Sequence, residues 1–345
     1  MKNELTISVI IPTHNRCASL RRTIDALCAQ TYSPQQVEVI VVADGCTDGT
    51  VEMLHHYRAP FALHIVEQLG QGAAGARNHG AARASGRMLL FLDDDIEATP
   101  SLIERHVHAH QRWPGHVVIG ACPPVFEGHT GIFQMGLRQW WEDQFRAMRQ
   151  SDHRYTYRDL LTGNLCLESG LFARVGGFDP TLRCREDYEF GLRVLKAGVS
   201  FTFAAGALAY HYETSDLDRS FQRIRQEGRA DVQIGRRHPE LRWSLPLAHL
   251  EVPCSRLRYV LRMFAFRQPR AGDALAARLR RALDLLEWAR LRGRWQRLYR
   301  QLRDYWYWRG VAEQVGSRQA LASFLQGGPI RPGDEGLEIE LDLRQ

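Results

Sequence analysis

Residues 88–95 read Met-Leu-Leu-Phe-Leu-Asp-Asp-Asp, a short apolar run that ends in three consecutive carboxylates. The apolar part has the length and composition of a strand buried on both faces of a sheet. Three adjacent carboxylates in a half-buried place repel one another, and a divalent cation relieves that repulsion. Oxygen ligands of this kind suit Mg²⁺ or Mn²⁺ that also contacts substrate phosphates. The stretch therefore predicts a metal site at the end of a strand, with a solvated acidic turn as the alternative.

The chain before residue 88 shows the same alternation of buried strands with helices. Short runs rich in apolar and β-branched residues predict strands over 5–11, 37–42 and 63–67, and helices are predicted over 17–29, 50–57 and 73–84. This alternation is typical of βαβ units, so we expect an α/β fold with a buried parallel sheet. Ligands of such sheets bind at the carboxyl ends of the strands.

Beyond residue 95 the alternation is less regular and then gives way to helices. We predict helices over 100–112, 135–148 and 186–197, and strands near 117–120, 164–167 and 200–204. Residues 216–326 are predicted to be helical, with interruptions at Pro239, Pro246, Pro253 and Pro269. Residues 337–343 alternate with period two and predict an amphipathic strand. The expected domains are an α/β domain at 1–215, a basic helical region at 216–326 and a tail at 327–345.

The composition is that of a folded protein without a membrane span. The 345 residues are 44% hydrophobic and 24% charged, which excludes disordered, collagen-like and coiled-coil chains. No run approaches the roughly 20 apolar residues that span a bilayer, and residues 1–11 lack the apolar core of a signal peptide. The seven cysteines form no Cys-x-x-Cys pair, which favours free thiols in a reducing compartment. We therefore expect a cytoplasmic protein.

The positive charge is concentrated in the helical region. The whole chain carries +6, whereas residues 216–326 hold 23 Arg against 11 Asp and Glu, a local excess of +12. Within 288–309, apolar residues recur at spacings of three and four, with arginines between them: Trp288, Leu291, Trp295, Leu298, Leu302, Tyr305 and Trp306. A helix packed on its neighbours explains this stripe, and so does a helix lying on an anionic membrane. Nucleic-acid binding is the third interpretation, although no recognised module is present.

A glycine-rich segment follows the third predicted strand. Gly70-x-Gly72-x-x-Gly75 fits the dinucleotide-binding fingerprint, with Asp93 about 20 residues further on. Two observations argue against a dinucleotide site. The segment does not open the first βαβ unit, and Asp93 is one of three consecutive carboxylates, whereas binding a ribose needs only one. We interpret it as a mobile loop that leaves Arg77 to face a phosphate. An NAD(P)-dependent oxidoreductase remains the alternative function.

Three histidines alternate within the helix predicted at 100–112. His106, His108 and His110 have the residue types of a metal site, but alternate residues of a helix point to different faces. Only His106 and His110 could meet, so we predict a solvated helix face instead of a metal cluster.

Five segments together resemble the family 2 glycosyltransferases of the GT-A fold. They read SVIIPTHNR at 8–16, VVADGCTDGT at 41–50, GAAGARNHG at 72–80, FLDDD at 91–95 and TGNLCLESGLFARVGGFDPTL at 162–182. The resemblance extends over about residues 5–212. It implies a GT-A (Rossmann-like) nucleotide-sugar-binding domain followed by a mostly helical C-terminal region. It also implies a metal-dependent, inverting transferase that moves a sugar from a nucleoside diphosphate, with UDP expected, to a hydroxyl acceptor.

The resemblance assigns donor-side roles to residues at the strand ends. Asp44 would accept a hydrogen bond from the base, Asp93 would face the ribose, and Asp95 would hold Mn²⁺ or Mg²⁺ against the diphosphate, together with His211. Because all three positions are Asp, the register of this assignment could shift by one, and Asp94 is also expected to contact the nucleotide. The rest of the nucleotide pocket would be lined by Pro12, Thr13, Asn15, Arg16 and Arg77. Ala43 departs from the family, which usually has an Asp there, so we expect weakened base selectivity.

The resemblance also assigns an acceptor side. Asp187 matches the position of the catalytic base, and at the start of a helix the dipole would keep it ionised; an ordinary acidic helix N-terminus is the alternative. Glu186 is expected to contact the acceptor or the sugar. Asn164 is expected to contact the sugar or to be a turn residue.

The partners expected from the resemblance are a nucleotide sugar and a saccharide or lipid-linked acceptor of bacterial surface-polysaccharide or glycolipid synthesis. Processive synthases of this family have Gln-x-x-Arg-Trp, whereas here Gln226-Glu-Gly-Arg229 is followed by Ala230. Single-sugar addition is therefore expected. Peripheral contact with an anionic membrane is an open expectation, nucleic acid is not an expected partner, and a nonenzymatic nucleic-acid-binding protein is the remaining alternative.

Overall fold

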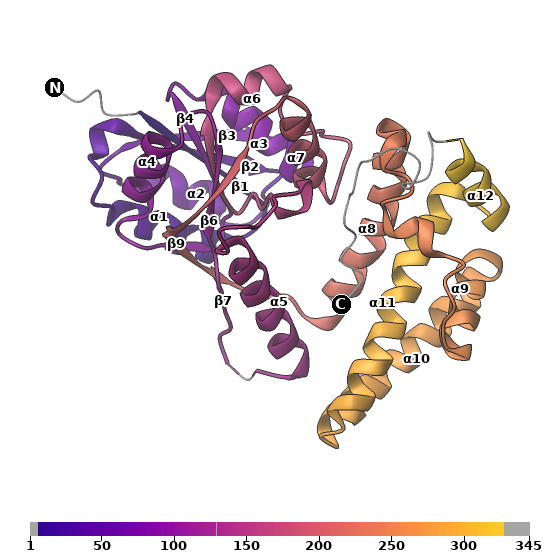
Figure 1. The fold of residues 1–345 in the computed structure, drawn as a ribbon. Coiled ribbons are helices and arrows are strands. Elements are labelled where there is room, and N and C mark those ends of the chain that lie inside the picture. The colour runs from indigo at the N-terminus through magenta and orange to yellow at the C-terminus, as the bar shows by residue number, and fades with distance from the viewer. Residues whose placement is uncertain (1–5, 129, 328–345) are drawn as a thin grey trace. The chain divides into compact units, whose positions relative to one another are not determined.

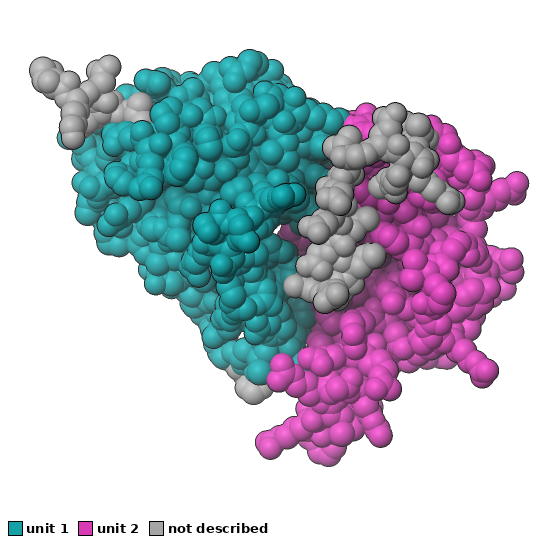
Figure 2. All heavy atoms as spheres, in the orientation of Figure 1, with its two compact units in different colours: residues 1–214 teal, residues 215–345 magenta. Residues whose placement is uncertain are grey.

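The computed structural model describes residues 6–128 and 130–327. It divides into two compact units, Met1–Thr214 and Ser215–Gln345, coloured separately in Figure 2. The first unit contains the sheet, and the described part of the second is helical. The amphipathic strand predicted at 337–343 lies outside the described residues.

Four parallel strands form the first half of the sheet. They are β1 (Ile7–Thr13), β2 (Val37–Asp44), β3 (Ala62–Gln68) and β4 (Met88–Leu92), in the order β3-β2-β1-β4. Val9 pairs with both Val39 and Leu90, and all three side chains are completely buried. The connecting helices are α1 (Cys17–Cys28), α2 (Thr50–His56) and α3 (Gly72–Arg83). Because the strands are parallel, their carboxyl ends lie along one edge of the sheet.

The parallel sheet expected from the βαβ alternation before residue 95 is confirmed, whereas the second half of the sheet is mixed. The antiparallel strand β8 (Asn164–Glu168) pairs with β4 and with β6 (Val117–Ala121). A long excursion through α4 (Leu102–Arg112) and α5 (Ile132–Met148) separates β4 from β8 in sequence, so no single crossover helix forces the strands parallel. The long strand β9 (Phe201–Tyr212) runs parallel to β6 and to β7 (Pro124–Val125).

Strand β9 is longer than predicted, and its last residues reach the acidic triplet. It pairs antiparallel with β5 (Ile96–Ala98), with His211 opposite Ile96, the residue after Asp95. Two further helices, α6 (Ser169–Val175) and α7 (Glu186–Lys196), are joined to the sheet by aromatic packing. The ring centroids of Phe91 in β4 and Phe172 in α6 are 5.2 Å apart, and those of Phe178 and Phe190 in α7 are 4.7 Å apart. Figure 1 shows α1 and α4 on one side of the sheet and α3, α6 and α7 on the other.

The prediction of a solvated histidine face on α4 is wrong for two of the three histidines. His106 and His110 are 1% and 6% exposed, whereas His108 is exposed. The reason is that Leu102 and Val107 share their stripe, so the imidazoles follow the apolar face into the core. Burial lowers the pKa of His106 to about 4 and that of His110 to about 3.

These histidines predict a dependence of stability on acid. Between pH 6.5 and 4.5 the unfolded chain protonates His110 while the folded chain keeps it neutral, so the free energy of unfolding falls as the pH is lowered. We expect His110→Phe to remove about 2 kcal/mol of this loss over that range. Urea titrations at several pH values measure the slope, and His108→Phe on the exposed face is the control. An unchanged slope in His110→Phe would contradict the prediction.

The C-terminal unit is built around one long helix, α11 (Arg292–Val315). It packs against α8 (Leu217–Arg237), α9 (Arg256–Arg267), α10 (Pro269–Trp288) and α12 (Arg318–Gln326). Gly228 of α8 and Gly310 of α11 allow close packing, since a Cβ at either would collide with the backbone of the other helix. A buried ion pair joins α9 to α11: Arg262 donates to both carboxylate oxygens of Asp304, at 2.8 and 2.9 Å.

Short 3₁₀ helices complete the secondary structure, at Pro34–Gln36, Tyr157–Asp159, Pro239–Leu241 and Pro246–His249. Among the described residues, no helix has both the length and the apolar character that crossing a membrane would require.

The apolar stripe predicted on one helix over 288–309 is divided by a turn. Helix α10 ends at Trp288 and α11 begins at Arg292, with Arg290 in the left-handed region at φ 55°. Trp295 and Leu302 are 2% and 0% exposed, so this part of the stripe is core, as the packed-helix interpretation required. Trp288 is 85% exposed and does not belong to that core. The membrane interpretation of the whole stripe is therefore wrong.

Candidate active site

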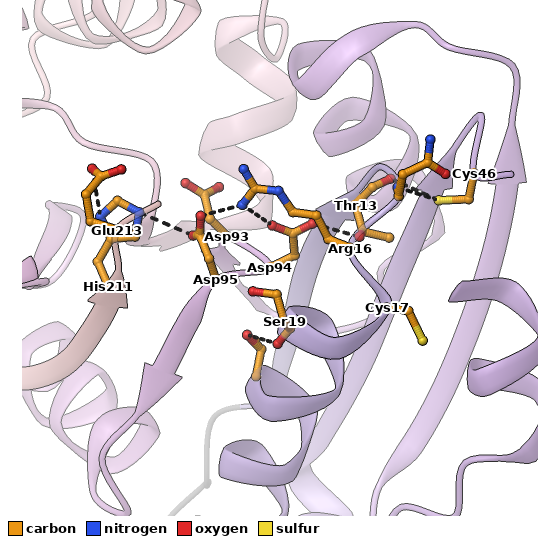
Figure 3. Close-up of polar contacts among 12 residues, drawn as sticks. Thr13, Arg16, Cys17, Ser19, Cys46, Asp93, Asp94, Asp95, His211 and Glu213 are labelled. Atoms are coloured by element: carbon orange, nitrogen blue, oxygen red, sulfur yellow. Dashed lines mark hydrogen bonds and ion pairs between the residues drawn. The ribbon is translucent and has the colours of Figure 1, made fainter. Parts of the chain in front are cut away.

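The acidic triplet lies where the ends of β1 and β4 meet. The register pairs Ile10 with Phe91, so Thr13 faces Asp94 three residues further on. The Thr13 hydroxyl donates to Asp94 Oδ2 at 2.7 Å, and Arg16 Nη1 donates to Asp94 Oδ1 at 3.2 Å and to Asp95 Oδ2 at 2.5 Å (Figure 3). Thr13 is buried and thus supports Asp94 from within the protein. The sequence-predicted residues Thr13, Arg16, Asp94 and Asp95 are brought together.

The C-terminal end of strand β9 contributes a histidine to this cluster. His211 Nε2 lies 3.4 Å from Asp95 Oδ1, and Nδ1 lies 4.0 Å from Glu213 Oε2 (Figure 3). Burial alone would lower the pKa of His211, but Asp95 outweighs it and raises that pKa. Glu213 was not predicted, although residues 211 and 213 of an extended strand point to the same face. That period-two spacing is the signal that could have found it.

The pKa values of Asp94 and Asp95 shift in opposite directions. Burial raises the pKa of Asp94 to about 6, against the opposing effects of Arg16 and Thr13. Burial alone would also raise the pKa of Asp95, but the neighbouring His211 and Arg16 lower it below the ordinary range. Asp95 therefore keeps its negative charge more readily than Asp94 does, as a metal ligand must.

The donor set at Asp95 fits a divalent cation that is shared with a substrate. Within the described parts of the chain, no three His, Cys, Asp or Glu side chains are grouped closely enough to hold a metal alone. However, Asp95 Oδ1 is buried without a hydrogen bond of normal geometry, beside the His211 imidazole. Mg²⁺ and related ions are commonly held by one or two protein ligands together with substrate phosphates. Asp95 and His211 match that arrangement.

Asp44 holds the glycine-rich segment. Its Oδ1 accepts hydrogen bonds from Gln68 Nε2 at 2.8 Å and from the Gln71 N–H at 2.7 Å, and its Oδ2 accepts one from the Gly72 N–H at 2.7 Å. Burial alone would raise the pKa of Asp44, but these hydrogen bonds lower it. A carboxylate has about four acceptor positions, so the expected hydrogen bond from a base would have to use the remaining one.

Asn15 organises the loop that follows β2. Its backbone is left-handed, at φ 53°, and its Oδ1 accepts hydrogen bonds from the Thr47 N–H at 2.7 Å and the Asp48 N–H at 3.2 Å. Pro12 lies inside β1, paired with Val42 of β2. Both residues thus shape the edge of the sheet at which a nucleotide was expected.

Arg77 occupies a different place from the one predicted. It is 4% exposed, and its guanidinium donates to Asp93 Oδ1 at 2.7 Å and to Glu186 Oε1 at 2.9 Å. Burial alone would lower the pKa of Arg77, but the two carboxylates raise it. The prediction that Arg77 faces a phosphate is therefore corrected: its charge is balanced inside the protein. It connects the end of β4 to the first turn of α7.

Asp187 lies in that first turn of α7. The helix begins at Glu186, after Arg185 in the left-handed region at φ 60°, and Asp187 Oδ1 accepts a hydrogen bond from the Tyr188 N–H at 2.8 Å. Because Arg77 holds the adjacent Glu186, the turn that carries Asp187 is fixed to the strand end that carries Asp93.

Asn164 is placed inside the fold, at the start of β8. It is 2% exposed, donates to the carbonyls of Ala121 and Ala207 at 3.2 and 3.0 Å, and bonds to His106 Nε2 at 2.7 Å. These contacts support a structural role in place of the expected sugar contact or turn.

Comparisons with known proteins agree with this site. The sequence model described as Glycosyl transferase family 2 matches residues 8–167, which contain the strand ends and the acidic triplet. The chain belongs to glycosyltransferase family 2. Two relatives, both validoxylamine A glucosyltransferases of Streptomyces hygroscopicus (subspecies limoneus and jinggangensis), are 31% identical to this family 2 glycosyltransferase over 264 residues, 68% of its chain. The alignments span 57% and 61% of these relatives' own lengths.

Solved structures show the same fold for this family 2 glycosyltransferase. TarS of S. aureus, residues 1–349, has a TM-score of 0.52 at 17% identity, covering 95% of this chain and 93% of that one. The mannosyltransferase PcManGT of Pyrobaculum calidifontis, solved with GDP-Man and Mn²⁺, has a TM-score of 0.53 at 19% identity, covering 88% and 86%. The likeness confirms the GT-A fold. The oxidoreductase and nucleic-acid-binding alternatives gain no support.

Proposed function

We propose that the enzyme transfers a sugar from a nucleoside-diphosphate donor, with UDP as the expected nucleotide, to a hydroxyl of an acceptor. One observation carries the proposal: the Asp93–Arg77–Glu186 bridge fixes Asp187 to the strand end that holds Asp95. A proton acceptor and a candidate metal ligand thus belong to one connected group. TarS crystallised with UDP and the mannosyltransferase with GDP-Man support a nucleotide-sugar donor.

A divalent cation, Mn²⁺ or Mg²⁺, is proposed as the cofactor. Asp95 and His211 would hold it, and the bound ion would offset the negative charge that the diphosphate gains on leaving. Arg16 adds a fixed positive charge against Asp94 and Asp95 on the same side of the site. The Mn²⁺ in the mannosyltransferase structure supports this part of the proposal.

Asp187 is proposed as the general base. Its carboxylate takes the proton of the acceptor hydroxyl while that oxygen attacks the anomeric carbon from the face opposite the diphosphate, so the anomeric configuration inverts. The positive end of the α7 dipole favours the ionised form that this role requires. Glu186, in the same turn, is paired with Arg77 and acts here as a positioning residue.

The proposed acceptor is a saccharide or a lipid-linked intermediate of surface-glycan synthesis, extended by one sugar at a time. Family membership supports this class. We place the reaction in the cytoplasm, which is supported by the free thiols of all seven cysteines.

The metal can be tested by binding alone. We expect Mn²⁺ to strengthen UDP binding by about tenfold or more over EDTA, and Asp95→Asn to remove that enhancement while the protein remains folded. Calorimetry of UDP, GDP and dTDP, each with Mn²⁺ and with EDTA, measures the effect and identifies the nucleotide. Asp152→Asn, at an exposed position, is the matched control. Equal UDP affinity in Mn²⁺ and in EDTA would refute the metal assignment.

A further inference from the structure

The turn between α10 and α11 exposes large apolar side chains. We call residues 285–297 the hairpin tip. Leu285, Trp288 and Leu291 are 68%, 85% and 40% exposed, whereas Trp295, one turn into α11, is 2% exposed. Figure 1 shows this tip at the lower end of the two helices, beyond the ends of α9 and α12. Trp295 is buried in the core of the unit, whereas these three apolar side chains remain exposed beside it. A group of exposed apolar side chains indicates a surface that binds an apolar partner.

The hairpin tip gathers four exposed arginines within eight residues. Within the described residues, no ion pair is found for the exposed Arg290, Arg292, Arg294 and Arg297. By contrast, several arginines in the rest of the unit are paired: Arg262 with Asp304, Arg280 with Asp218 and Asp284, and Arg225 with Glu313. Residues 290–303 contain no Asp or Glu. Because Glu287 is the one acidic residue of the tip against four arginines, residues 285–297 carry a net charge of +3.

The position of these arginines adds to the charge. Arg292 and Arg294 lie in the first turn of α11, which has no acidic residue, so they face the positive end of the helix dipole. The turn itself is well defined: the Arg290 N–H donates to the Glu287 carbonyl and the Leu291 N–H to the Leu286 carbonyl, both at 2.9 Å. An anionic partner would relieve the repulsion at this helix end.

We propose that the hairpin tip docks the enzyme on the anionic surface of a lipid bilayer. Trp288 and the two leucines enter the headgroup region, where indole rings are favoured, and the four arginines contact lipid phosphates. An acidic protein or a nucleic acid would match the charge, but neither accounts as well for three exposed apolar side chains beside it. This proposal does not depend on the proposed glycosyl transfer, because the hairpin tip belongs to the C-terminal unit, whereas the candidate active site belongs to the N-terminal unit.

The test is sedimentation of the full chain with vesicles of phosphatidylcholine alone or mixed with phosphatidylglycerol. We expect binding to the anionic vesicles only, weakening as NaCl is added. Replacing Arg292, Arg294 and Arg297 by Gln should lower the affinity about 100-fold, since each arginine near the surface contributes about fivefold. The matched control replaces the exposed Arg267, Arg270 and Arg278 by Gln, which changes the net charge equally. This control should retain most of the binding.

The apolar part has its own test. Trp288→Ala should weaken vesicle binding and leave the melting temperature unchanged, whereas Trp295→Ala should lower the melting temperature because Trp295 is core. Three outcomes would overturn the proposal: wild-type protein that does not sediment with anionic vesicles, equal losses in the two triple variants, or binding to a DNA duplex without binding to vesicles.

Discussion

Asp187→Asn is expected to lower turnover by about 100-fold or more while UDP binding survives. Asparagine keeps the size and the hydrogen-bonding shape of the side chain but does not take up a proton, and general bases contribute about 10²–10⁴-fold. The variant should fold normally, because the Arg77 bridge to Glu186 still holds the turn and the Oδ1 of asparagine can still accept the hydrogen bond from the Tyr188 N–H. Turnover on the acceptor and the dissociation constant of UDP are measured separately.

The control for this prediction is Asp152→Asn, the same substitution at an exposed position of the same unit. Near-normal turnover of Asp187→Asn would remove Asp187 from the mechanism. A loss of UDP affinity as large as the loss of turnover would instead assign the residue to donor binding.

The sequence predicted the first half of the site because that half depends on local patterns. Apolar runs locate β1 and β4, and their parallel pairing places Thr13 beside Asp94 through a simple register. Asp187 was located by motif, and the predicted start of α7 at residue 186 agrees with the structure.

The rest of the site depends on contacts between distant segments, which local patterns do not reveal. Arg77 and Glu186 are 109 residues apart in sequence, and only the folded structure shows that they form an ion pair. Asn164 was expected to contact the sugar or to be a turn residue, but its side chain is buried at the start of β8, where it bonds to His106 of α4. The turn at Arg290 was missed because a non-glycine residue adopts the left-handed conformation there.

Arg77→Met is expected to destabilise the fold and to impair catalysis together. Removing the guanidinium leaves Glu186, whose side chain is 14% exposed, and Asp93 without their shared cation. Breaking a buried ion pair in this way costs about 3–5 kcal/mol. The Asp93 side chain is 36% exposed, so water screens its charge. We therefore expect the free energy of unfolding to fall by about 3 kcal/mol, the lower end of this range.

A second variant separates charge from positioning. Asp93→Asn and Glu186→Gln, added to Arg77→Met, remove the uncompensated carboxylates, so stability measured by urea titration should recover. Turnover should stay low, because the first turn of α7, which carries Asp187, has lost its connection to the end of β4. If turnover recovered with stability, Arg77 would be needed only for folding. Wild-type stability of Arg77→Met alone would show that this bridge contributes nothing to holding the site together.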